Sequence, residues 1–240
     1  MRSGEIVGLP VHMGSGVSDL LSGISGQRVF DEGAVHFGSG DVTRTNMRRK
    51  IRAGLCLVPG DATTEGLIST LTIEENILLP NLKAYSQFGV VRRKRIRALC
   101  MEIIGLLDIR PANPNIAVRN LSGGNRQKVV IAKWLAAGAR LLVMDDPTKG
   151  VDVGAKMEIY TCIGDFVGKG RAVLWASTDV DELLGLADQM VVIRDGEVAG
   201  TFQREEVDKV AILDLMIGSQ PGAPPTSVGE LDAATRAPSQ

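Results

Sequence analysis

Residues 121–128, Leu-Ser-Gly-Gly-Asn-Arg-Gln-Lys, and residues 141–148, Leu-Leu-Val-Met-Asp-Asp-Pro-Thr, decide the fold of this 240-residue chain. The first run places Ser122 and two glycines before a helix, where a hydroxyl, bare backbone N–H groups and the positive helix end favour an anion. The second run is apolar and ends in Asp145 and Asp146, so it predicts a buried strand that carries two carboxylates to the C-terminal edge of a sheet. In nucleotide hydrolases the first such carboxylate holds Mg²⁺ and the second orients or deprotonates water. Both runs at this spacing favour a nucleotide site over a plain helix cap and a plain turn.

Strands and helices alternate along the rest of the chain. Strands are expected over residues 5–9, 33–37, 54–58, 140–144, 172–175, 190–193 and 197–202. Helices are expected after residue 16, from 71, over 92–107, after 124, and over about 153–167 and 179–186. This alternation predicts an α/β fold with a mostly parallel sheet and helices packed on it.

Composition excludes several classes of protein. Lys and Arg total 27 against 28 Asp and Glu, so the net charge is -1. This charge produces no positive electrostatic potential over the protein as a whole, which argues against a dedicated nucleic-acid-binding protein. Cys56, Cys100 and Cys162 have no metal or redox spacing and are expected to be buried thiols. No apolar run reaches the about 18–20 residues that cross a bilayer, and the start lacks the layout of a signal peptide. We therefore expect a cytoplasmic protein whose membrane role, if any, comes through a partner.

A few conspicuous residues are given structural readings. The basic run over residues 92–97 is interpreted as a solvated helix face, because no aromatic residue is interleaved with it. His12 and His36 have no spaced ligand partners, and Trp134 and Trp175 lie in apolar stretches, so we expect structural roles for all four. Residues 219–240 are rich in Pro, Ala, Ser and Gly and are expected to be a disordered tail.

The motifs resemble those of a known family. Residues 121–128 resemble the signature motif of ABC-type ATPases, and Leu141–Lys156 resembles their Walker B and D-loop. Leu57–Asp61, Glu65–Leu67 and Gly150–Lys156 are similar to the second nucleotide-binding domain of the tandem ATPases of monosaccharide importers of the ribose, xylose and galactose type. The resemblance runs from about Ser3 to Gly218. It implies a P-loop NTPase fold with a reduced antiparallel layer, and ATP and Mg²⁺ as cofactors.

The resemblance also implies roles for individual residues. Asp146 and Thr178 take the catalytic positions, and Asp145 and Ser18 the metal positions. The nucleotide-binding positions are Gly14, Ser15, Gly16, Val17, Ser18 and Gly60. The signature residues are Leu121, Ser122, Gly123, Gly124 and Gln127, and Asp152 belongs to the D-loop.

Several of these positions depart from the family pattern. In a phosphate-binding loop of the form G-x-x-x-x-G-K-[ST], Val17 stands where the lysine belongs and Val11 where the first glycine belongs. A charge-assisted contact contributes about 1.5–3 kcal/mol, so affinity through this loop should fall by about one to two decades. Gly60 replaces the Q-loop glutamine, Asp146 the catalytic glutamate and Thr178 the switch histidine. We expect inefficient hydrolysis in this site.

The signature motif is intact, and the resemblance implies a partner that uses it. Two such domains pair head to tail, so the signature of this chain would complete an ATP site on a second nucleotide-binding domain. Membrane permease subunits, and indirectly a periplasmic sugar-binding protein, are the other implied partners. A helical subdomain over about residues 62–124 would contact the permease, within a domain over residues 1–218. The complex would sit on the inner face of the cell membrane.

The family's usual antiparallel strands are not expected ahead of the phosphate loop, because only a handful of residues precede it. The adenine-stacking aromatic residue is not expected there either, because no Tyr, Phe or Trp comes before Phe30. The chain is either a fragment of a tandem ATPase or a separate subunit. The main alternative function is a truncated pseudo-ATPase that only binds a partner. A soluble ATPase acting on DNA or ribosomes is disfavoured, because it would need a coiled-coil insertion or a tandem chain with a charged linker.

Overall fold

The computed structural model describes residues 1–82, 85–87, 90–91 and 93–218. The predicted tail over residues 219–240 and the basic residue Arg92 lie outside the described residues. Among the described residues no helix is long and apolar enough to cross a membrane.

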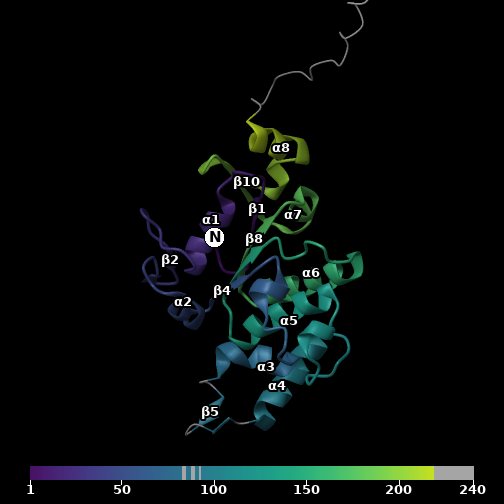
Figure 1. Ribbon diagram of the computed structural model, residues 1–240. Helices are drawn as coiled ribbons and strands as arrows, with labels where there is room; N and C mark the ends of the chain where they lie inside the picture. Colours follow the sequence, from purple (N-terminus) through teal and green to yellow (C-terminus); the bar gives the residue numbers. More distant parts are fainter. Residues whose placement is uncertain (83–84, 88–89, 92, 219–240) are drawn as a thin grey trace, which may run out of the picture.

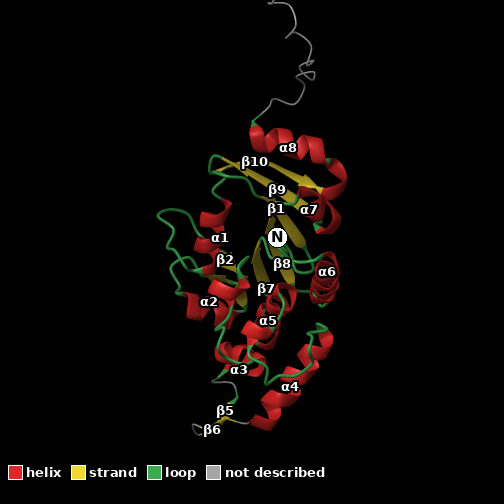
Figure 2. Ribbon diagram, turned by 45° about the vertical axis from the view of Figure 1, so that its right-hand side comes forward, coloured by secondary structure: helices red, strands yellow, loops and turns green. Residues whose placement is uncertain are grey.

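A six-stranded sheet in the order β10-β9-β1-β8-β7-β4 forms the centre of the molecule (Figure 2). All neighbouring strands are parallel except β10, which pairs antiparallel with β9. The turn between β9 and β10 has positive φ at Asp195 (53°) and Gly196 (80°), as the predicted hairpin requires. The predicted mostly parallel α/β sheet is confirmed. Its strands are β1 (Ile6–Pro10), β4 (Leu55–Val58), β7 (Leu141–Asp145), β8 (Ala172–Ser177), β9 (Gln189–Arg194) and β10 (Glu197–Gln203).

Helices cover both faces of this sheet (Figure 2). On one face, α1 (Val17–Ser25) packs on an apolar cluster that includes Leu9, Leu141 and Val143, and α2 (Met47–Ala53) lies beside it along β4. The other face is covered by a larger cluster around Trp175, which has no exposed surface. Its helices are α5 (Gly123–Ala136), α6 (Val153–Gly168), α7 (Val180–Leu186) and α8 (Lys209–Ile217).

Two helices extend the larger cluster at the lower end of Figure 1. Helix α3 (Ile73–Leu78) begins with a capping box made by Thr72 and Glu75, and α3 and α4 (Arg93–Leu106) both contact α5. The helix predicted over residues 92–107 is observed over Arg93–Leu106, and its helical spacing is confirmed there, because Ile96, Cys100, Ile103 and Ile104 form the buried face of α4.

Short elements connect the main ones. Ala62–Gly66 forms a single π-helical turn after β4. The strand predicted over residues 33–37 is reduced to β2 (His36–Phe37), which pairs only with β3 (Gly40–Asp41). The others are β5 (Ser86–Gln87), β6 (Val90–Val91) and three 3-10 turns at Leu79–Asn81, Val118–Asn120 and Arg204–Glu206.

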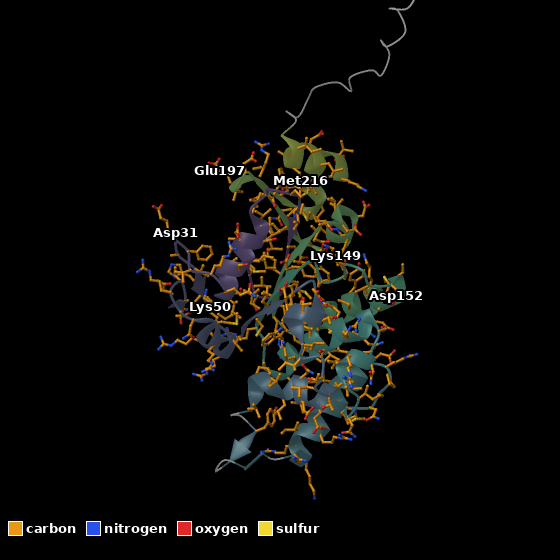
Figure 3. The ribbon with its side chains drawn as sticks, viewed as in Figure 1. Asp31, Lys50, Lys149, Asp152, Glu197 and Met216 are labelled. Atoms are coloured by element: carbon orange, nitrogen blue, oxygen red, sulfur yellow. The ribbon has the colours of Figure 1, made fainter. Side chains whose placement is uncertain are left out.

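Lys50 of α2 is a buried lysine that could not be distinguished in the sequence from exposed lysines. Its side chain is 1% exposed, and its ammonium donates to the carbonyl oxygens of Gly23 and Ile24, 3.0 Å away, at the C-terminal end of α1 (Figure 3). Burial lowers the pKa of Lys50. The contact satisfies carbonyl groups that a helix end leaves without intrahelical partners, so it fixes α1, and the loop before it, against α2.

The three cysteines and Trp175 are buried in the core. Cys56, Cys100 and Cys162 are buried free thiols, as expected, and burial raises the pKa of each to about 12. Trp175 is a core residue, as expected, whereas Trp134 is only partly buried.

Candidate functional site

The loops with candidate residues leave the sheet at one edge. Strands β1, β8, β7 and β4 are neighbours and run parallel, so their C-terminal ends lie side by side. The loop over residues 11–16 follows β1, and Thr178 follows β8. Asp145 is the last residue of β7 and Asp146 the first residue after it, and Gly60 is in the loop that follows β4. This edge of an open α/β sheet is where ligands bind.

The loop between β1 and α1 presents small residues to solvent. Gly14, Gly16 and Ser18 are exposed, and Gly14 and Gly16 have φ of 83° and 82°, a backbone conformation that favours glycine. Ser15 is buried and anchors the loop, because its N–H donates to the carbonyl of His12 (3.2 Å) and its hydroxyl accepts from the N–H of Val17 (3.4 Å). The loop therefore ends at the positive end of α1 with its glycine backbone uncovered.

Val17, at the position of the family's lysine, has no exposed surface. Its side chain belongs to the apolar cluster with Leu9 and Leu21 beneath the loop. The side chain thus contributes to the core, and the loop carries no cation at this position.

The carboxylates of Asp145 and Asp146, at the C-terminal end of β7, lie beside the end of β8. Asp145 pairs in register with Ala176, and Asp146, in a left-handed conformation with φ of 48°, donates its N–H to the carbonyl of Ala176 (2.8 Å). The hydroxyl of Thr178 donates to Oδ2 of Asp146 at 3.0 Å. Burial is the main cause that raises the pKa of Asp145, and the negative charge of Asp146 raises it further. Two like charges held together in a partly buried site favour a cation.

Gly60 lies directly against this pair. A Cβ atom at Gly60 would be 2.8 Å from the carbonyl oxygen of Asp145 and 3.3 Å from that of Asp146. A glutamine here would force the two backbones apart. The glycine at position 60 therefore lets the loop after β4 approach the end of β7 closely.

The exposed residues of the predicted signature motif and the predicted D-loop residue Asp152 form a second surface. Ser122 caps α5, and its oxygen accepts from the N–H (3.4 Å) and the side-chain amide (2.9 Å) of Asn125. Accepting both bonds leaves the Ser122 proton to donate outward. A Cβ atom on the buried Gly124 would lie 2.7 Å from the Cβ of Ala155, so α5 and α6 meet closely here.

Asp152 begins α6 beside this junction, at the flank of the molecule (Figure 3). Its Oδ1 accepts from the N–H of Ala155 at 3.0 Å. Not every signature residue shares the exposed surface with Ser122 and Gly123. Leu121 is buried, and the buried amide of Gln127 donates to the carbonyl of Pro59 at 3.0 Å. Gln127 thus links α5 to the loop that carries Gly60 and does not face outward.

Sequence reasoning missed a buried carboxylate next to the candidate site. Glu182, in the first turn of α7, accepts hydroxyl hydrogen bonds from Thr148, Tyr160 and Ser177. The only sequence signal is its position three residues after the helix cap Asp179, which is ordinary for an exposed acidic residue in a first turn.

A cavity of about 90 Å³ lies beside the loop after β4. Its walls include Met47 and Ile51 of α2, Pro59 of the loop, and Lys133 and Trp134 of α5. The ammonium of Lys133 donates to the carbonyl of Gly66 and lies 4.4 Å from the ring centroid of Trp134. Burial lowers the pKa of Lys133 to about 8.

This lowered pKa predicts a pH dependence of stability. Between about pH 8 and pH 10.5 the folded chain releases the Lys133 proton while the unfolded chain keeps it, so the unfolded state binds more protons and stability rises with pH. We expect the free energy of unfolding of the wild type to increase by about 2 kcal/mol relative to Lys133→Met across this window. Urea unfolding at several pH values measures this. Lys149→Met, at an exposed lysine, is the control, and the same pH slope in both variants would contradict the prediction.

Known proteins resemble this chain over most of its length. The family model for ABC transporters matches residues 1–149. The ribose import ATP-binding protein RbsA 2 of Streptomyces coelicolor is 38% identical over 229 residues, which are 95% of this chain and 44% of that protein. The ribose import ATP-binding protein RbsA of Bacillus subtilis is 36% identical over 220 residues, 92% of this chain and 45% of that protein. The chain thus spans less than half the length of these relatives.

Two solved structures share the fold. MJ1267, an ATP-binding cassette of an ABC transporter in its ADP conformation, aligns with a TM-score of 0.75 and 23% identity, over 90% of this chain and 89% of that one. Dimeric MJ0796, a cassette bound to ADP and Pi, aligns with a TM-score of 0.72 and 22% identity, over 85% and 87%. The P-loop fold predicted from the motifs is therefore confirmed. With the family model matching more than half of its residues, the chain belongs to the ABC transporter family.

Proposed function

We propose that the chain is an ATP-binding subunit of an ABC transporter that imports sugars. It acts as a degenerate second nucleotide-binding domain and donates its signature motif to the ATP site of a partner. The observation that carries this proposal is the contrast between two surfaces. Ser122 and Asp152 lie together on an exposed surface, whereas the phosphate loop has the apolar, buried Val17 in place of its cation. Its relatives, named as ribose import ATP-binding proteins, support sugar import.

The chain's own nucleotide site fits Mg²⁺ and a phosphate in part. The carboxylate of Asp145 and the exposed hydroxyl of Ser18 are oxygen donors, which Mg²⁺ prefers. The backbone around Gly14 and Gly16 suits phosphate oxygens. Mg²⁺ would neutralise phosphate charge, Asp146 and Thr178 would orient a water molecule, and the missing lysine weakens the hold on the triphosphate. Hydrolysis by the isolated chain is therefore weak or absent, and turnover belongs to the assembled complex.

The implied partners follow from these surfaces. A second nucleotide-binding domain would pair head to tail over Ser122 and Asp152; the relative MJ0796 is dimeric in its structure. Permease subunits would dock on the helical subdomain over residues 62–124 and on the loop at Gly60 and Asp61, next to the cavity lined by Trp134. A periplasmic sugar-binding protein would act only through the permease. No nucleic acid is involved, and the complex would lie at the cytoplasmic face of the membrane.

The alternative is a non-catalytic interaction protein, a truncated pseudo-ATPase. Val17 favours it most, because a buried valine supplies no charge to a phosphate. Asp146, Thr178 and Gly60 favour it for the chain's own site, but none of them bears on the signature surface.

Equilibrium titration of the purified chain with Mg-ATP tests whether its own loop binds nucleotide. We expect weak binding that becomes weaker still, by about threefold to tenfold, in Ser18→Ala, because the variant loses one hydroxyl ligand. Ser69→Ala, a serine outside the candidate site, is the matched control. Absence of binding in the wild type would leave the signature surface as the only nucleotide surface, and equal binding by Ser18→Ala would remove Ser18 from the site.

A further inference from the structure

Glu182 places a buried carboxylate beside the candidate site. Its side chain is 7% exposed and accepts three hydroxyl donors from three other parts of the chain. Thr148, in the loop after β7, and Tyr160 of α6 donate to Oε1 at 2.5 and 2.6 Å, and Ser177 at the end of β8 donates to Oε2 at 2.6 Å. With two donors on Oε1 and one on Oε2, the orientation of the carboxylate is fixed.

Ser177 lies between two carboxylates. Its Oγ is 2.6 Å from Oε2 of Glu182 and 3.4 Å from Oδ1 of Asp146, and it accepts the N–H of Asp179 at 3.0 Å. A serine hydroxyl has one proton and can donate only one full hydrogen bond. The shorter contact takes that proton, so Ser177 donates to Glu182.

This arrangement decides what Asp146 can accept. Its Oδ2 already accepts from the hydroxyl of Thr178 at 3.0 Å. We propose that Glu182 is a positioning residue that draws the Ser177 proton away from Asp146, so that Oδ1 of Asp146 keeps both of its lone pairs and its full charge for a hydrogen bond from the reacting water. The inference rests on the proposed role of Asp146 in orienting water.

The other two donors keep Glu182 in this role. Burial is the main cause that raises the pKa of Tyr160, and its hydrogen bond to Glu182 raises it further. The Tyr160 hydroxyl therefore stays protonated at neutral pH. Thr148 is buried and, like Asp146, belongs to the loop that follows β7. From the first turn of α7, the Glu182 carboxylate thus connects the loop that contains Asp146 with α6 and with the end of β8. Its position is therefore tied to the position of the site residues.

Glu182→Gln reverses the Ser177 hydrogen bond. Two hydroxyl donors face the position of Oε1, so the amide oxygen occupies it and the amide nitrogen faces Ser177. The nitrogen then donates to Ser177, whose proton turns to Oδ1 of Asp146. Crystal structures of the full chain should show the distance between Ser177 Oγ and Asp146 Oδ1 shorten from 3.4 Å to about 2.8 Å.

Turnover by the complex with the partner domain gives the second readout. We compare Glu182→Gln with the wild type in complexes that also carry Ser122→Arg, which silences the ATP site of the partner, so that the residual turnover comes from the site that contains Asp146. We expect Glu182→Gln to lower this residual kcat by about tenfold or more while KM for ATP stays unchanged, because no phosphate contact is touched. Adding Ser177→Ala to Glu182→Gln should restore most of the kcat, because it removes the competing proton. Glu182 acting only as structural support predicts the opposite, a further loss in the double variant.

Tyr160→Phe is the matched control. It removes one hydroxyl donor from the same carboxylate but leaves the Ser177 bond in place, so the distance between Ser177 and Asp146 should stay at 3.4 Å. An unchanged distance in Glu182→Gln, or a double variant slower than the single one, would overturn the inference. A complex that lacks turnover in the wild type would instead count against the proposed function, and the crystal distances would still decide the role of Glu182.

Discussion

Ser122→Arg is expected to abolish ATP turnover by the complex of this chain and its partner domain, with a loss of at least about 100-fold. Ser122 is exposed at the N-terminal end of α5, with its oxygen occupied by Asn125 and its proton left to donate. In the proposed head-to-tail pair this proton and the helix end would face the triphosphate held by the partner. An arginine side chain would fill the space of the phosphate and remove the hydroxyl donor.

Steady-state ATPase assays on the assembled complex measure this loss. Ser122 also caps α5, so its replacement costs about 1 kcal/mol of stability, which is too little to unfold a domain of this size. Ser122→Asp separates the two effects, because aspartate keeps the cap but places a negative charge against the phosphates. Asn120→Arg, on the same exposed loop, should leave turnover unchanged. Full activity in Ser122→Arg would remove the signature surface from the reaction.

The sheet could be predicted from the sequence because its strands carry strong local signals. Strands β1 and β7 are buried along nearly their whole length, and an unbroken apolar run is typical of a parallel strand covered on both faces. Helix α4 could be predicted because its apolar residues repeat at helical spacing. Helix α2 could not, because its one fully buried side chain is the lysine Lys50. Helix α8 was also missed, since apolar residues occur on all its sides and leave no one-sided pattern.

For the candidate site, only the residues that directly follow a strand could be placed from the sequence. Parallel strands carry their following loops to one edge, so the placement of the phosphate loop, Asp146 and Thr178 at the same edge follows from the predicted parallel sheet. The hydrogen bond between Thr178 and Asp146 also needs β7 and β8 to be neighbours, and the sequence did not predict that order. The close approach of Gly60 to the backbone of Asp145 depends on tertiary packing and has no local signal. Glu182 was missed for the same reason. It accepts hydrogen bonds from three hydroxyl groups that come from separate parts of the chain, and no local sequence pattern marks these residues as its partners.

Val17→Lys is expected to bind Mg-ATP about 10-fold to 100-fold more tightly than Val17→Met. Val17 has no exposed surface, so either long side chain must leave the apolar cluster and emerge beside the exposed Gly16 and Ser18. Both variants give up the apolar packing of Val17 and therefore lose similar stability, about 1–3 kcal/mol, so this loss cancels in the comparison. The variants differ mainly in the ammonium, which supplies the charge that the loop lacks.

Isothermal titration with Mg-ATP measures the two affinities, and urea unfolding of both variants checks that their stabilities match. A tighter lysine variant would mean that the loop over residues 11–18 still has the geometry to hold a triphosphate and that the buried Val17 alone weakens it. Equal affinities would mean that the loop no longer faces a phosphate, because a cation added at the family's position would then contact nothing. In that case the chain would contribute to ATP hydrolysis only through Ser122 and the surface beside Asp152. The complex would then have one competent and one degenerate ATP site, an asymmetry that the burial of Val17 already favours.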